Sequence, residues 1–193
     1  MEAYNAGQRV FGENRVQELL PKADALPQDI EWHLIGTLQR NKVKYIVPFV
    51  AMIHSVDSIK LLEEIEKLCR KIGRKEMPVL LQLHISEEET KHGFSEEELY
   101  ELLKSDVLNS LECVQVSGLM GMAALTEDMS IVEHQFAKLQ ELFHQLKHST
   151  FADSPYFKEL SIGMTHDYPI ALKHGATYIR LGSAIFGEPN RSR

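Results

Sequence analysis

The fold is decided near the C-terminus by two stretches, LSIGMT at residues 160–165 and ATYIRLGS at residues 176–183. Each reads as a short apolar strand that stops at a turn of small residues, and each turn is followed by a helix start. Two adjacent strand-to-helix turns offer backbone N–H groups and helix N-termini, which together suit an anion. In a (β/α) barrel the loops after strands seven and eight usually hold a phosphate, so this pair predicts both a barrel and a phosphate site.

The same alternation of strand and helix extends back to the N-terminus. Earlier strands are predicted at residues 9–12, 31–36, 51–56, 78–85 and 113–118, and most read as continuous apolar runs. Buried runs separated by helices are typical of a parallel sheet. We therefore predict an α/β fold, a (β/α)8 TIM-type barrel in one domain over residues 1–193, with the first strand absent at the N-terminus. An open doubly wound sheet is the alternative.

Helix starts are predicted from capping boxes, in which a serine is followed three residues later by a glutamate. Ser95 with Glu98 is one such pair, and Ser130 with Glu133 is another. The second pair predicts the start of a long helix that turns phenylalanine and leucine side chains inward.

Composition limits the classes of function. The 193 residues are 44% hydrophobic and 25% charged, which is enough for one substantial core. The net charge of −7 argues against a nucleic-acid partner. The sequence has neither a signal peptide nor an apolar run that could span a bilayer, and its two cysteines fall in apolar segments. We expect a cytoplasmic monomer with no membrane partner.

Several polar residues lie at or within predicted strands. Arg180 lies beside the two C-terminal turns, and its guanidinium can always donate hydrogen bonds because it does not lose its proton at ordinary pH. Asn14 follows the first predicted strand, where its amide faces a ligand or caps the next helix. His33 and His54 are interpreted as satisfied core histidines.

Metal and nucleophile chemistry are not predicted. The histidines of the long helix lack the HExxH pattern and are expected on its solvent face: His134, His144 and His148. The acidic run at residues 87–89 lacks the alternating ligands of a calcium loop and is interpreted as a charged loop. No nucleophile-elbow, Rossmann or P-loop motif is present.

The motifs together resemble one family. FGENRVQE at residues 11–18, WHLIG at residues 32–36 and IRLGSAIFGE at residues 179–188 carry the likeness, which extends over essentially the whole chain. The chain is similar to the pyridoxal phosphate homeostasis proteins, also called proline synthetase co-transcribed homologues, which have the alanine-racemase-like barrel.

The resemblance implies binding of pyridoxal 5′-phosphate (PLP) without defined catalysis, and a role in balancing the cofactor and amino and keto acid pools. It assigns no catalytic residue. By position it implies contacts to the phosphate or ring from Asn14, Ser161, Gly163, Met164, Arg180, Gly182 and Ser183. An arginine at the ring nitrogen would disfavour its protonation and weaken the electron sink, which suits a carrier.

The resemblance also implies a Schiff-base lysine at the end of the first strand, which this sequence lacks. We therefore expect an N-terminally truncated or mis-started form of a longer protein. Of the lysines present, only Lys91 is expected in a loop at the C-terminal ends of the strands, and its polar setting suits a Schiff base poorly. Any PLP is therefore expected to bind non-covalently. The alternatives are a PLP-dependent racemase-like enzyme and a barrel for another phosphorylated metabolite.

Overall fold

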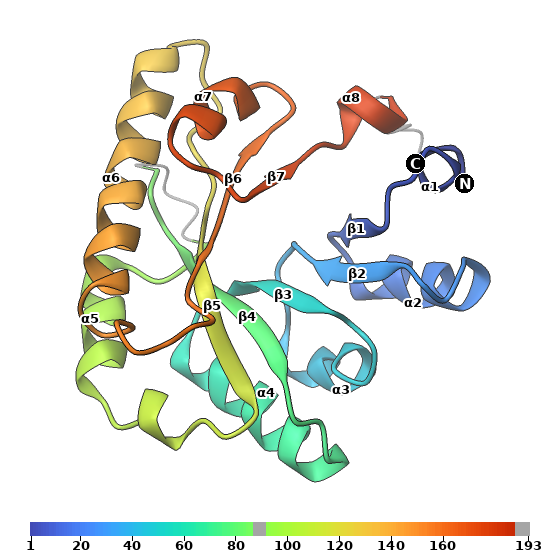
Figure 1. Cartoon of the computed structure of the whole chain (residues 1–193), viewed down its shortest axis with the longest axis horizontal. Helices are drawn as coiled ribbons and strands as arrows, with labels where there is room; N and C mark the ends of the chain where they lie inside the picture. Colours follow the sequence, from blue (N-terminus) through green and yellow to red (C-terminus); the bar gives the residue numbers. More distant parts are fainter. Residues whose placement is uncertain (87–91, 188–193) are drawn as a thin grey trace.

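The structure, a computed structural model, describes residues 1–86 and 92–187. Strands and helices alternate along the chain (Figure 1). The strands are β1 (Val10–Glu13), β2 (Glu31–Leu34), β3 (Met52–Val56), β4 (Met77–Leu83), β5 (Val114–Gly121), β6 (Glu159–Met164) and β7 (Tyr178–Arg180). The helices are α1 (Glu2–Asn5), α2 (Val16–Ala25), α3 (Val43–Ile46), α4 (Ile59–Ile72), α5 (Glu96–Lys104), α6 (Met129–Lys147), α7 (Tyr168–Lys173) and α8 (Ser183–Phe186). The short 3-10 helices are η1 (Arg40–Lys42) and η2 (Leu108–Ser110).

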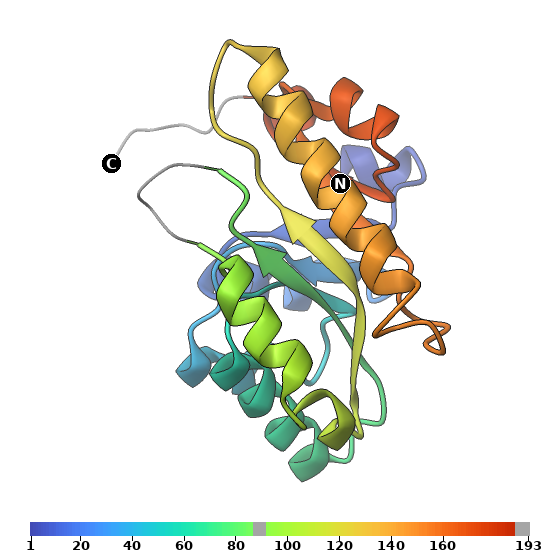
Figure 2. The same ribbon diagram turned by 90° about the vertical axis from the view of Figure 1, so that its left-hand side faces the viewer.

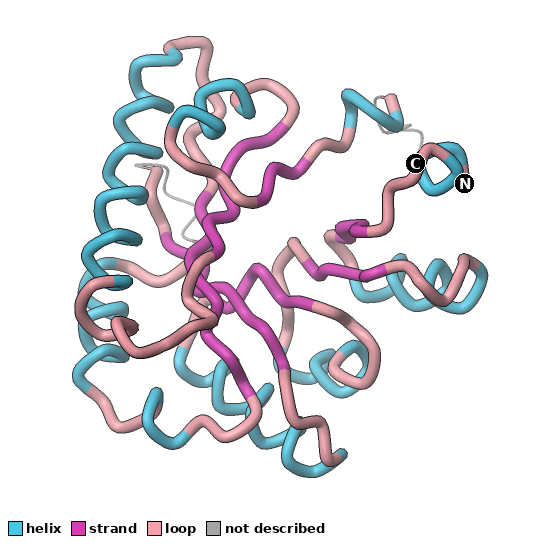
Figure 3. The backbone as a smooth tube through the Cα atoms, viewed as in Figure 1, coloured by secondary structure: helices cyan, strands magenta, loops and turns pink. Residues whose placement is uncertain are grey.

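The seven strands of the described residues form one parallel sheet in the order β1-β2-β3-β4-β5-β6-β7. A doubly wound sheet reverses its strand order at a switch point, so the sequential order rules that alternative out. The sheet curves as a barrel wall does, with β1 and β7 as its edge strands in the part of the chain that the structure describes (Figure 3). The predicted α/β barrel with seven strands is confirmed.

The helices cover the outer side of the sheet because each carries an apolar stripe. In α4, Leu62, Ile65 and Cys69 are fully buried, while the opposite face is charged. Ser58 caps the start of this helix by accepting the N–H of Leu61, and Gly73 ends it in the left-handed region. Figure 2 shows α5 and α6 lying along the outer side of β4 and β5.

The helix caps match one prediction and correct another. Ser95 and Glu98 form the expected capping box at the start of α5. The predicted box of Ser130 and Glu133 is wrong, because Asp128 caps α6 and Ser130 lies inside the helix. The Asp128 carboxylate accepts both the backbone N–H and the hydroxyl of Ser130, at 3.0 and 2.6 Å. An ionised acceptor two residues upstream starts the helix before the serine can.

Two apolar clusters lie on opposite sides of the sheet. The larger one fills the space between the strands and the helices and includes both cysteines, which are buried as expected. The smaller one, inside the barrel, consists of Met52, Leu80 and Met120, with Met122 and Tyr178 packed against it. In the described ranges, no helix combines the length and the apolar character needed to cross a membrane.

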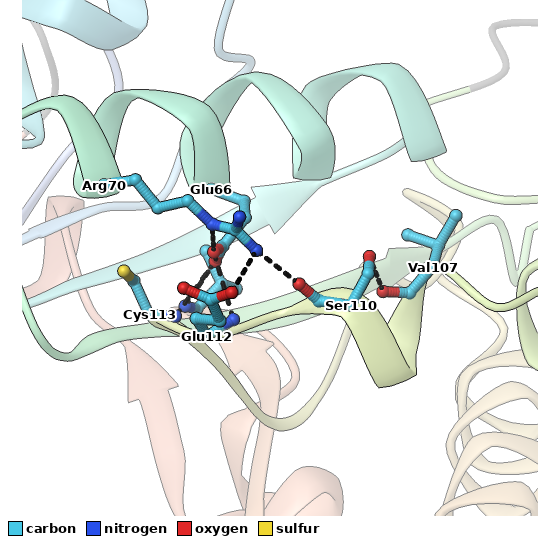
Figure 4. Close-up of polar contacts among 7 residues, drawn as sticks. Glu66, Arg70, Val107, Ser110, Glu112 and Cys113 are labelled. Atoms are coloured by element: carbon cyan, nitrogen blue, oxygen red, sulfur yellow. Dashed lines mark hydrogen bonds and ion pairs between the residues drawn. The ribbon is translucent and has the colours of Figure 1, made fainter.

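A buried carboxylate ties α4 to the start of β5 (Figure 4). One oxygen of Glu66 accepts Arg70 Nε–H and the backbone N–H of Glu112, at 2.6 and 3.0 Å. The other oxygen accepts the backbone N–H groups of Cys113 and Val114, at 3.1 and 2.9 Å. This carboxylate clasp lies at the N-terminal end of a strand, the face of a (β/α) barrel that serves stability rather than ligand binding.

Candidate functional site

Four polar side chains from four strands form a chain of hydrogen bonds inside the barrel. His33 Nδ1 on β2 lies 2.9 Å from His54 Nε2 on β3. His54 Nδ1 lies 2.9 Å from the hydroxyl oxygen of Ser161 on β6. Arg180 on β7 donates from Nη1 to that hydroxyl at 2.7 Å, and from Nη2 to the carbonyl of Gly121 at 3.0 Å. This polar relay therefore crosses the barrel interior from β2 to β7.

The two imidazoles are buried among aromatic and apolar groups. His33 and His54 are 4% and 2% exposed, and the Tyr178 ring lies edge-on to both, with centroids 5.4 and 5.3 Å away. Burial lowers the pKa of His33 to about 4. Burial, the neighbouring His33 and the charge of Arg180 lower the pKa of His54 well below its ordinary value. Both rings are neutral at pH 7, which confirms the prediction of satisfied core histidines.

Arg180 carries a positive charge into this interior. Burial lowers its pKa to about 10, while the nearby carboxylate of Asp167 acts in the opposite direction. The guanidinium is therefore still charged at pH 7. The bonds that hold it go to a neutral hydroxyl and a neutral carbonyl, and within the described ranges it makes no ion pair at 4.0 Å or less. A partly buried charge without a direct counter-ion favours an anionic or strongly accepting ligand.

The turn after β6 is held by its own side chains. Gly163 has a φ of +90°, and a Cβ there would lie 2.5 Å from the Cβ of Ala171. Asp167 Oδ1 accepts the backbone N–H of Met164 at 2.5 Å, so this N–H is not free as the sequence suggested. Asp167 is 1% exposed, and its Oδ2 has no hydrogen-bond partner in residues 1–86 and 92–187. The turn thus places a buried carboxylate close to Arg180.

The turn after β7 is more open. Gly182 is the N-cap of α8, and a Cβ there would meet no atom within 4 Å; Ser183 is the first residue of this helix. Asn14 is exposed at the end of β1. Its alternative role as a helix cap is wrong, because Arg15 is the N-cap of α2. A Cβ at Gly36 would overlap the backbone of Asn14, so the ends of β1 and β2 approach closely.

A cavity opens at the C-terminal ends of β4, β5 and β6, the face on which barrel enzymes bind ligands. Met164 lines it and is the register partner of Arg180 on the neighbouring strand. The other lining residues are Leu83, His84, Ile85, Ser86, His92, Met122, Ala123 and Leu125. Met164 is thus the one predicted site residue in this described lining, and the relay residues themselves do not line the cavity.

The described lysines do not directly follow a strand, although Lys22 Nζ bonds the carboxylate of Glu13, the last residue of β1. They are on helices or in the segments that lead into strands: Lys22, Lys42, Lys44, Lys60, Lys67, Lys71, Lys75, Lys104, Lys138, Lys147, Lys158 and Lys173. Lys91 and the acidic run at residues 87–89 lie outside the described residues. In the described ranges there is also no group of three or more histidine, cysteine or acidic residues that could hold a metal ion.

The structure brings two of the predicted site residues into contact and connects two further residues to them. Ser161 and Arg180 are in direct contact, whereas Asn14 directly follows β1, the opposite edge strand. The sequence did not indicate that His33 and His54 extend this contact across the barrel. The one available signal was their position within two consecutive predicted strands.

The fold and its polar interior define the class of protein, a (β/α) barrel of the alanine racemase kind. The family described as alanine racemase, N-terminal domain, matches residues 1–189. The pyridoxal phosphate homeostasis protein of Aquifex aeolicus is 43% identical over 188 residues, which cover 97% of this chain and 80% of that protein. The chain belongs to the family of pyridoxal phosphate homeostasis proteins.

Solved structures agree with this assignment. PipY of Synechococcus elongatus is 38% identical, and the match covers 96% of this chain and 85% of PipY. The TM-score is 0.88 to PipY without PLP and 0.84 to PipY with PLP bound.

Proposed function

We propose that this protein binds PLP non-covalently at the C-terminal face of its barrel and serves PLP homeostasis without catalysing a reaction of its own. The observation that carries the proposal is the partly buried guanidinium of Arg180, whose direct partners are neutral. PLP offers a phosphate dianion, a phenolate oxygen and a ring nitrogen, and all of these accept hydrogen bonds. The names of the relatives and the PLP-bound structure of PipY support the same ligand.

The residues proposed to hold PLP surround this charge. Arg180 supplies donors to the ring nitrogen or the phosphate. The open turn at Gly182 and Ser183 supplies backbone N–H groups, and Gly163 lets the β6 turn pack closely. Asn14 and Met164 complete the proposed contacts, and Ser161, which is 0% exposed, acts through its hydrogen bond to Arg180. The partner is a small molecule, and we propose that the protein acts as a cytoplasmic monomer.

The proposal of non-covalent binding rests on the positions of the lysines. PLP supplies an aldehyde that condenses with amines and a ring that withdraws electrons. To use this chemistry in catalysis, a barrel needs a partly desolvated lysine at the C-terminal end of a strand. The described lysines lie elsewhere. We therefore propose that the described residues bind and orient the cofactor without attaching it, and that Lys91, which lies outside them, suits a Schiff base poorly because its sequence neighbours are polar.

Equilibrium dialysis against PLP tests the proposal. The wild-type protein should bind one equivalent, and Arg180→Met, which keeps a long unbranched side chain but removes the charge, should bind at least tenfold more weakly. Arg15→Met is a matched control, because Arg15 is exposed and pairs only with Glu18 among its described contacts. Equal affinity in all three proteins would contradict the proposal. Tighter binding of another phosphorylated metabolite than of PLP would assign the site to that ligand.

A further inference from the structure

The polar relay has a direction that follows from its chemistry. A guanidinium can only donate, so the Ser161 hydroxyl oxygen accepts from Arg180. The hydroxyl hydrogen then needs an acceptor of its own. The other contact recorded for this hydroxyl in the described residues is His54 Nδ1, at 2.9 Å.

The reverse direction leaves one group unsatisfied. If His54 donated from Nδ1 to Ser161, the hydroxyl would accept twice and its hydrogen would have no recorded acceptor within the described ranges. Ser161 is 0% exposed, so water cannot easily take that role. A buried donor without an acceptor is costly, whereas the forward direction satisfies each contact. The order of donation is therefore Arg180 to Ser161, Ser161 to His54 and His54 to His33.

This order fixes the tautomer of both rings. His54 accepts at Nδ1 and donates from Nε2, and His33 accepts at Nδ1, which places its proton on Nε2. A second proton on His54 would compete for the lone pair that the serine uses. The Tyr178 ring packs against both imidazoles, and the charged group that acts on His54 is the positive Arg180, which disfavours an imidazolium.

We propose that His33 and His54 are positioning residues that, as neutral Nε2–H tautomers, orient the Ser161 hydroxyl and thereby fix the Arg180 guanidinium toward the ligand. Nη1 is held by Ser161 and Nη2 by the carbonyl of Gly121, so the plane of the guanidinium is set at two points. Its remaining N–H groups are then oriented before the ligand arrives, which reduces the ordering cost of binding. This inference rests on the proposed function, because the ligand that Arg180 meets is taken to be PLP.

The first test reads the tautomers directly. Two-bond ¹H–¹⁵N correlation spectra of the ligand-free protein at pH 7 should show His33 and His54 as neutral rings with the proton on Nε2. An Nδ1–H tautomer or a doubly protonated ring at either residue would overturn the inference. In Ser161→Ala the constraint on His54 is removed, and its signal should change while the fold is retained.

The second test separates positioning from packing. His54→Leu fills the space but cannot accept from Ser161, and should weaken PLP binding about tenfold. His54→Asn keeps an acceptor near the position of Nδ1 and should bind within about threefold of the wild type. A folded His54→Leu protein with wild-type affinity would overturn the positioning role, and so would failure of His54→Asn to restore binding.

The two tests also distinguish this inference from the proposed function. If the wild-type protein binds no PLP, the proposed function fails, and the tautomers of the ligand-free protein still decide the inference. If the wild type binds PLP but its histidines have other tautomers, the inference fails and the proposed function stands.

Discussion

Replacing Glu66 with glutamine should destabilise the protein strongly although it changes only one atom of the side chain. The carboxylate accepts three backbone N–H groups and the Nε–H of Arg70 through its two oxygens (Figure 4). In Glu66→Gln one oxygen becomes an NH₂ group. Whichever way the amide turns, this donor faces two other donors, either Arg70 with Glu112 or Cys113 with Val114.

The size of the effect follows from these contacts. Two hydrogen bonds to a charged acceptor are lost, each worth about 1.5–3 kcal/mol. Some of this is recovered because the Arg70 side chain is 45% exposed and can turn to water. We expect the free energy of unfolding to fall by about 3–5 kcal/mol, a large part of the ~5–15 kcal/mol typical of a domain. Glu64→Gln is the matched control on the same helix, because the ion pair of Glu64 within the described part of the chain is a long one with Lys67, and the change should alter stability by less than ~1 kcal/mol.

Urea unfolding followed by circular dichroism measures both variants. Burial by itself raises the pKa of Glu66, but the hydrogen bonds from Arg70 and the backbone outweigh it and hold the pKa below the ordinary 4.5. Because the pKa of Glu66 is lower in the folded than in the unfolded protein, its ionised carboxylate stabilises the fold at pH values above 4.5. This stabilisation is lost as the pH falls through the folded-state pKa. The difference between wild type and Glu66→Gln should therefore shrink below pH 4.5. A loss below ~1 kcal/mol at pH 7, or a pH-independent difference, would refute the reasoning.

Three other changes should be measurable by the same unfolding method. Gly163→Ala should cost about 2–4 kcal/mol, because the residue has positive φ and the new Cβ meets Ala171; a neutral effect would mean that the β6 turn relaxes freely. Asp128→Ala should cost about 1 kcal/mol through loss of the α6 cap, whereas Glu127→Ala should cost less than ~0.5 kcal/mol. His33 stays neutral in the folded protein down to about pH 4, whereas in the unfolded chain it binds a proton below about pH 6.5. The free energy of unfolding should therefore fall as the pH drops from 6.5 to 4, and this fall should be shallower in His33→Asn. An equal slope in both proteins would contradict the buried neutral ring.

The sequence predicted the order of elements well because the signals for them are local. The apolar stripe of α4 and the capping box of Ser95 with Glu98 are contained within a few turns of chain. The Ser130 box failed for an equally local reason, since Asp128 offered a better acceptor two residues earlier. Strand order also followed from the pattern, because a barrel pairs each strand with its neighbour in sequence.

The candidate site was predicted only in part because its contacts are not local. His54 and Ser161 are 107 positions apart and meet only when β3 and β6 face the same interior. No periodicity in either segment indicates such a pair. The contact of Ser161 with Arg180 was easier to foresee, since both lie on the last two strands. The assignment of all seven residues to the ligand remains a prediction: Asn14, Ser161, Gly163, Met164, Arg180, Gly182 and Ser183.

Trapping with borohydride tests the central claim most directly. The 193-residue protein is saturated with one equivalent of PLP, reduced with sodium borohydride, and weighed intact by mass spectrometry after denaturation. The account predicts that PLP binds, as dialysis of an unreduced sample would show, and that the reduced protein keeps its unmodified mass because the cofactor is held by non-covalent contacts around Arg180. A stoichiometric pyridoxyl adduct on one lysine would contradict it, and peptide mapping would then identify the lysine that attaches the cofactor.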